Sequence, residues 1–234
     1  RKLSDIDLMT APDSADAVKK ILAERNFSIG SFYDRYTSQI RPISRESKAI
    51  YRLYNDHLPH AVKLTDSGVP PYVDVDVALS LTWARSDWQV PMDICLEESE
   101  QIEVTSDART LPSLSPRVHF VFLIMHLYRE AYFHTVGHDV RLAQFADIAL
   151  FWRKYRQTLK SSVASFIYKN HLESPCATIL GYVDDIFGCS IIQDIGLEIT
   201  YDPERHLVHT GGKSVRWDGD IVGRLLAGGP AMQH

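Results

Sequence analysis

The stretch Ser4-Asp5-Ile6-Asp7-Leu8-Met9 holds two aspartates two residues apart in a short apolar segment. We expect a strand here, followed by a turn at residues 11–14 and a helix that carries the apolar residues of 17–22. Because side chains i and i+2 of a strand point to the same face, Asp5 and Asp7 should lie close enough to share a ligand. Two like charges at that distance repel unless a cation holds them, and Mg²⁺ is the cation that a few carboxylates suit.

A second pair, Asp74 and Asp76, lies in residues 72–79, where apolar and polar residues alternate. Residues 61–65 alternate too, and the Gly/Pro-containing connection between the two segments predicts an antiparallel pair. Two strands of one sheet would thus present up to four carboxylates around one spot, which are the parts that metal-dependent phosphoryl-type transfer needs. The spacing alone leaves an alternative open, in which the aspartates lie on a solvated sheet face.

The rest of the chain is mostly helical in pattern after residue 110. We expect helices there at 118–133, 140–158, 161–169 and 175–187, and one earlier helix at 44–54. The helix at 118–133 is apolar enough to be a buried core helix. In the helix of 140–158 the side chains expected to point inward are Leu142, Phe145, Ala146, Ala149, Leu150 and Trp152. The predicted fold class is therefore α/β (α+β): a mixed-sheet domain at 1–110, a helical region at 111–200 and an irregular or peripheral tail at 201–234.

Composition limits the classes of partner. The 234 residues include 25 Lys and Arg against 30 Asp and Glu, a net charge of −5, so bulk attraction to nucleic acid is not expected and bound cations would have to reverse the local field. No apolar run is long enough to span a membrane. The three cysteines are far apart, which argues against disulfides and structural zinc and favours the cytoplasm.

Several stretches of the sequence resemble one known family. Arg1-Lys2-Leu3-Ser4-Asp5-Ile6-Asp7-Leu8 resembles the Arg-x-x-Ser-Asp-Ile-Asp-Leu signature of the nucleotidyltransferase-fold superfamily, and closely that of its bacterial, largely uncharacterised family 5 branch. Residues 73–76, 111–116, 123–127 and 141–150 are similar to later motifs of that branch, which typically has histidine where Asp76 stands. The similarity covers about residues 1–190.

This resemblance implies a metal-dependent reaction. An acceptor attacks the α-phosphorus of a nucleoside triphosphate such as ATP, and pyrophosphate leaves. Asp5, Asp7 and a third carboxylate, Asp74, would hold Mg²⁺, or Mn²⁺ in its place, and Asp74 would also help to activate the attacking group. Asp76 is the competing candidate for that role and for metal binding. The acceptor would be a small molecule or a protein side chain.

Further residues are candidates for nucleotide or acceptor binding. Arg1 and Ser4 flank the first aspartate, and Arg1 is either a triphosphate contact or a solvated terminal arginine. The other candidates lie in the helical region, where a core histidine and an internal ion pair are the alternative interpretations: His126, Arg141 and Asp147. Four further histidines lack metal-ligand spacing and are interpreted as surface residues: His57, His60, His134 and His138.

One family element has no counterpart here. The family places a glycine-containing loop just upstream of its signature, and the sequence begins at Arg1. We therefore expect either that residues precede Arg1 in the native chain or that this is a truncated member. In the second case the chain would be a catalytically inactive interaction module. A metal-dependent phosphohydrolase that uses the same carboxylates is a further alternative.

Overall fold

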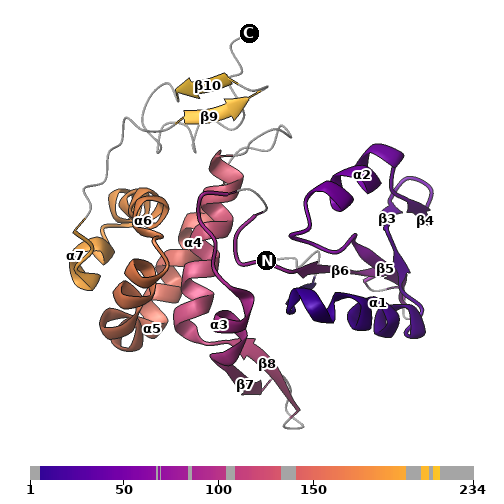
Figure 1. The fold of residues 1–234 in the computed structure, drawn as a ribbon, viewed down its shortest axis with the longest axis horizontal. Helices are drawn as coiled ribbons and strands as arrows, with labels where there is room; N and C mark the ends of the chain where they lie inside the picture. Colours follow the sequence, from indigo (N-terminus) through magenta and orange to yellow (C-terminus); the bar gives the residue numbers. More distant parts are fainter. Residues whose placement is uncertain are drawn as a thin grey trace. The chain divides into compact units, whose positions relative to one another are not determined.

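The structure, a computed structural model, describes residues 6–66, 68, 70–83, 86–103, 109–132 and 141–198, and the backbone of two short strands beyond them. The chain divides into two compact units, residues 1–97 and 98–234, and each is described by itself (Figure 1). The boundary expected near residue 110 falls inside the second unit, at the start of a strand.

A four-stranded mixed sheet forms the centre of the first unit. Its strands lie in the order β1 (Ile6–Met9), β6 (Tyr72–Ala78), β5 (Ala61–Leu64) and β2 (Ser28–Ile29). Strand β1 runs parallel to β6, whereas β5 is antiparallel to both β6 and β2. The strands expected at 4–9, 61–65 and 72–79 are all present, and the last two form the antiparallel pair that their connection predicts.

One face of this sheet is apolar and is covered by helix α1 (Ala15–Glu24). Val75 and Val77 of β6 pack there with Val18 and Leu22 of the helix, as alternation along the strand requires. Asp74 and Asp76 alternate with these valines along β6 and therefore lie on the opposite face of the sheet. Helix α2 (Arg45–Leu53) lies on the other side of the sheet from α1 (Figure 1).

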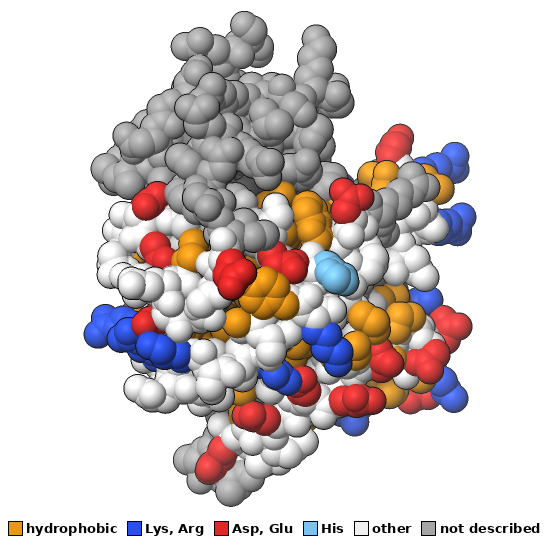
Figure 2. All heavy atoms as spheres, turned by 60° about the vertical axis from the view of Figure 1, so that its left-hand side comes forward, with side chains coloured by type: hydrophobic (Ala, Val, Ile, Leu, Met, Phe, Trp, Pro, Cys, Tyr) orange, Lys and Arg blue, Asp and Glu red, His pale blue; other side chains and the backbone are white. Residues whose placement is uncertain are grey.

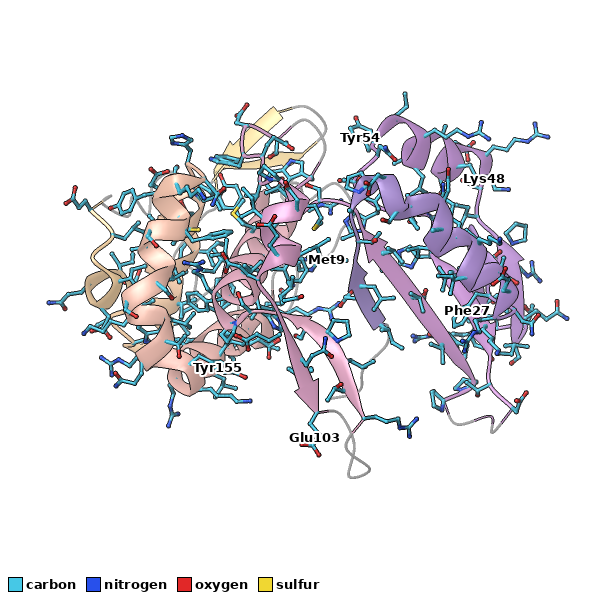
Figure 3. The ribbon with its side chains drawn as sticks, turned by 60° about the horizontal axis from the view of Figure 1, so that its bottom comes forward. Met9, Phe27, Lys48, Tyr54, Glu103 and Tyr155 are labelled. Carbon is cyan, nitrogen blue, oxygen red and sulfur yellow. The ribbon has the colours of Figure 1, made fainter. Side chains whose placement is uncertain are left out.

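Ser44 caps the amino-terminal end of helix α2. Ser44 accepts a hydrogen bond from the backbone N–H of Ser47 at 3.1 Å, which satisfies one of the otherwise unpaired donors of the first turn. The apolar residues Ile50 and Leu53 are 55% and 65% exposed. Lys48 and Tyr54, labelled in Figure 3, are exposed as well.

The first unit also contains elements that the sequence analysis did not predict. They are the short strand β2, the antiparallel hairpin of β3 (Ser31–Asp34) and β4 (Gln39–Pro42), and the short helix α3 (Met92–Glu97), whereas the turn expected at 11–14 is present as the 3₁₀ turn Pro12–Ser14. The hairpin escaped prediction because both strands are short and β4 is mostly exposed, so apolar alternation is weak. Its turn depends on Ser38, which adopts a φ of 53°, a left-handed conformation in a residue that is not glycine.

Helices dominate the second unit. They are α4 (Pro116–Tyr132), α5 (Leu142–Lys169), α6 (Glu173–Phe187) and α7 (Ile191–Ile195), and an antiparallel hairpin of β7 (Ser99–Glu103) and β8 (Thr110–Leu114) precedes them. Glu103 marks the end of β7 in Figure 3. Helix α4 is the buried core helix that its composition predicts, with Val118, Phe120, Val121 and Ile124 fully buried. None of the described helices is both long enough and apolar enough to cross a lipid bilayer.

Helix α5 corrects two expectations. The helices predicted at 140–158 and 161–169 are one continuous helix, because Leu159 and Val163 are both buried and keep the apolar face unbroken across the expected gap. Phe145, Ala149 and Trp152 point inward as predicted, whereas Leu142 and Leu150 are 42% and 59% exposed. Leu150 is exposed because position i+5 from Phe145 falls on the far side of the helix.

The last described elements are a two-stranded antiparallel hairpin, β9 (Leu207–Thr210) and β10 (Lys213–Arg216). The expectation of an irregular or peripheral tail overlooked these strands. The pair Gly211-Gly212, which joins them in the sequence, is a hairpin signal.

Candidate active site

Two aspartates on neighbouring strands are the centre of the candidate site. In the parallel pairing of β1 with β6, Asp7 is the partner of Asp76. Paired residues on adjacent strands point to the same face, and such strands lie about 4.8 Å apart. The Asp7 side chain is exposed, whereas Asp76 is 22% exposed. The pairing therefore holds two carboxylates side by side, one of them partly shielded from water.

Asp74 extends this acidic face along β6. It lies two residues before Asp76, so it points to the same side of the sheet, and it is 23% exposed. Of the predicted site residues, the structure thus brings together Asp7, Asp74 and Asp76. The other three from the amino terminus, Arg1, Ser4 and Asp5, lie outside the described residues.

Each carboxylate of β6 contacts a histidine. His57 Nδ1 lies 3.0 Å from Asp76 Oδ1, and His60 Nδ1 lies 3.2 Å from Asp74 Oδ1. His60 also faces the second aspartate, because its Nε2 is 3.9 Å from Asp76 Oδ2. An ionised carboxylate can only accept hydrogen bonds, so the Nδ1 atom of each histidine is the donor.

The backbone fixes the segment that carries both histidines. Leu58 N–H donates to the carbonyl of Val77 at 2.8 Å, and Leu79 N–H donates to the carbonyl of Asp56 at 2.7 Å. The carbonyl of His60 accepts from Gly30 N–H at 2.8 Å. Residues 56–60 are therefore tied to the end of β6 and to the turn after β2, and this anchoring places the histidines beside the aspartates.

His57 and His60 were expected to be surface residues, but both are partly buried against the aspartates. Their exposed side-chain fractions are only 19% and 35%. A usable signal was available in the sequence, because His60 comes directly before a strand predicted to pair with the strand of Asp74, and His57 comes three residues earlier. His134 and His138 lie outside the described residues.

An aromatic pair borders the acidic face. Tyr72, two residues before Asp74 on β6, stacks on Tyr33 of β3 with ring centroids 4.3 Å apart. Arg35 donates to the hydroxyl of Tyr72 at 3.3 Å, and this hydrogen bond raises the pKa of Arg35 above its ordinary value. The stacking indicates that these tyrosines pack on each other.

A scan against protein families matches residues 1–188 to a family described as an uncharacterised nucleotidyltransferase. The chain belongs to this family. Searches of curated proteins and of solved structures each found no match. The family match and the α+β architecture agree with the resemblance drawn from the sequence motifs, and the family description supports a general nucleotidyltransferase activity.

The donor atoms of the acidic face are of the kind that suits Mg²⁺, the cation expected from the sequence motifs. Mg²⁺ prefers oxygen ligands and is usually bound by one or two carboxylates together with water and substrate phosphates. Asp7 and Asp76 supply such a pair from adjacent strands. Among the residues that the structure describes, no three His, Cys, Asp or Glu side chains form a group that could hold a metal ion. A two-carboxylate arrangement is thus the one that the described residues offer.

The remaining predicted site residues lie in the second unit. His126, on α4, is exposed, and its ring centroid lies 5.6 Å from that of Phe122, so the alternative of a core histidine does not hold. Arg141 is exposed before α5, where its backbone N–H donates to Gln144 Oε1 at 2.8 Å. Asp147 is half-buried within α5. Their part in nucleotide or acceptor binding stays a prediction.

Proposed function

We propose that this chain transfers a nucleoside monophosphate from a nucleoside triphosphate to a small-molecule or protein acceptor at the face that carries Asp7, Asp74 and Asp76. The observation that supports this most is the parallel pairing of Asp7 with Asp76 in a member of a nucleotidyltransferase family. An oxygen of the acceptor forms a bond to the α-phosphorus. The bond from that phosphorus to the bridging oxygen breaks, and pyrophosphate leaves with the electron pair.

The proposed cation is Mg²⁺, with Mn²⁺ as a substitute. Asp7 and Asp76 are the ligands that we propose from the described residues, and Asp5 is the further ligand that the sequence motif suggests. When bound, the cation would neutralise charge on the phosphates and help to orient them. This local charge reversal matters because the whole chain has a net charge of −5. On the face drawn in Figure 2, acidic and basic side chains of the described residues are interspersed.

Asp74 is proposed as the carboxylate that accepts the proton of the attacking hydroxyl. It lies on the same face as Asp76 but one strand repeat further along β6, about 6.6 Å away at the backbone. Asp76 is the alternative for this role. The variants Asp74→Asn and Asp76→Asn decide which aspartate has this role. Loss of the general base should lower kcat and leave metal affinity unchanged, whereas loss of a metal ligand should weaken metal binding itself.

The test compares Asp7→Asn, Asp74→Asn and Asp76→Asn with Asp93→Asn, a control at an exposed aspartate of α3. Binding of Mg²⁺ together with each nucleoside triphosphate is measured by calorimetry, and pyrophosphate release is measured on the same samples. We expect binding by the parent chain and the control, and its loss in Asp7→Asn. If Asp7→Asn binds Mg²⁺ and the triphosphate as tightly as the parent chain does, the proposed site is contradicted.

The same samples separate the two alternatives. A catalytically inactive interaction module would bind no triphosphate in the presence of Mg²⁺. A phosphohydrolase would release inorganic phosphate in place of pyrophosphate.

A further inference from the structure

Both aspartates of β6 contact a histidine that lies outside the proposed ligand set. His57 and His60 stand three residues apart in the segment before β5, and each uses the same ring atom, Nδ1, toward an Oδ1 oxygen. The same contact made twice on one strand indicates a built arrangement. The contacts are also shielded, since the side chains of His57 and Asp76 are 19% and 22% exposed.

We propose that His57 and His60 are positioning residues that hold the carboxylates of Asp76 and Asp74 in the orientation that a divalent cation and the acceptor require, an inference that rests on the proposed function. A carboxylate on a strand can turn about two side-chain bonds. A hydrogen bond to Oδ1 restricts that rotation and sets the direction of the other oxygen, Oδ2. Hydrogen bonds to ligating groups act in this way in metal sites generally.

The scaffold behind the histidines supports a positioning role. The backbone of residues 56–60 is bonded to β6 on both sides of His57, through the N–H of Leu58 and the carbonyl of Asp56. Leu58 is itself 3% exposed and packs in the core with Val75 and Val77. The imidazoles are thus carried by a segment that backbone hydrogen bonds tie to β6, the strand that carries the aspartates, so the fold sets the distances between them.

The position of the donor atom provides a sharp test. An asparagine side chain can place an amide N–H near the position of histidine Nδ1, whereas alanine has no donor. We therefore compare His57→Asn with His57→Ala, and His60→Asn with His60→Ala, in the full chain. His171→Asn is the matched control, because His171 is exposed in the second unit and its φ of 54° suits asparagine.

The measurement is the dissociation constant for Mn²⁺ alone, by calorimetry or electron paramagnetic resonance, with thermal unfolding to show that each variant is folded. We expect His57→Ala to weaken Mn²⁺ binding by about 10- to 100-fold, and His57→Asn to recover most of that loss. His60→Ala should chiefly lower the kcat of pyrophosphate release, because His60 orients Asp74. The control should bind as the parent does.

Three results would overturn the inference in distinguishable ways. If the parent binds Mn²⁺ and the folded His57→Ala and His60→Ala variants match it in affinity and in kcat, the histidines are structural and only the inference fails. If the parent itself binds no Mn²⁺, the proposed metal site fails and the inference fails with it. Equal losses in the alanine and asparagine variants would contradict the role of the Nδ1 hydrogen bond.

Discussion

The replacement Asp7→Asn should stabilise the metal-free protein while it removes the metal site. Asp7 and Asp76 are partners on adjacent strands, so their charges lie side by side without a bound cation. Like charges directly opposite each other in a sheet destabilise it, and we take the size of the effect as that of favourable cross-strand pairs, roughly 0.2–1 kcal/mol. Because Asp7 is exposed, water screens the repulsion between the two carboxylates. The repulsion energy therefore stays within that range and well below the energy expected for a buried pair of like charges.

The expected gain is small but measurable. For a chain of this size, 1 kcal/mol of unfolding free energy corresponds to roughly 2–4 °C in Tm. In EDTA at low ionic strength, the Tm of Asp7→Asn should therefore exceed that of the parent by no more than this amount. The gain should shrink when salt is added, because salt screens exposed charges. Mg²⁺ at millimolar concentration should then raise the Tm of the parent and leave that of Asp7→Asn unchanged.

The assay is differential scanning calorimetry, with Asp93→Asn as the control for a general effect of removing one negative charge. A variant that unfolds earlier than the parent in EDTA would refute the view that the two carboxylates repel each other. A variant that Mg²⁺ stabilises as much as it stabilises the parent would refute the assignment of Asp7 as a ligand.

Two further predictions concern the helical unit. Burial lowers the pKa of His119 below its ordinary value of 6.5, so the unfolded chain binds a proton there more readily than the folded chain. The free energy of unfolding should therefore fall as the pH drops below about 6.5. His119→Gln should make this free energy depend less on pH, as measured by chemical unfolding from pH 5 to 8. An unchanged pH dependence in the variant would contradict this expectation. Trp152, 2% exposed, packs near Phe120 in the core, so Trp152→Ala should cost about 3–5 kcal/mol of unfolding free energy. Leu150→Ser on the exposed side of the same helix should change it by less than about 0.5 kcal/mol, and similar losses in urea unfolding for both variants would contradict the assigned faces.

Local patterns were sufficient to predict much of the fold. Alternation in residues 72–78 and the valines between the aspartates predicted β6 and its two faces, and the dense apolar run after Ser115 predicted the buried helix α4. These features depend on side-chain periodicity within one element, which a sequence carries directly. The limits of α5 were missed because Leu159 and Val163 keep the helix face apolar across the break that was expected between residues 158 and 161.

The candidate site was predictable only in part. The two Asp-x-Asp pairs indicated an acidic sheet face, but the neighbour of Asp7 is set by the parallel register of β1 and β6, which pair across more than sixty residues of sequence. No local pattern encodes such a long-range register. The histidines were missed for a similar reason: His57 and His60 are ordinary loop residues until backbone hydrogen bonds to β6 bring them beside the aspartates.

The central claim is that the acidic face of the first unit carries out metal-dependent nucleotidyl transfer. The most direct measurement uses the full chain with Mg²⁺, a triphosphate labelled at the α-phosphorus, and candidate acceptors that include the chain itself. The account predicts one pyrophosphate released for each label transferred to an acceptor, and no transfer by the double variant Asp7→Asn with Asp76→Asn. Full label transfer by that folded double variant would contradict it.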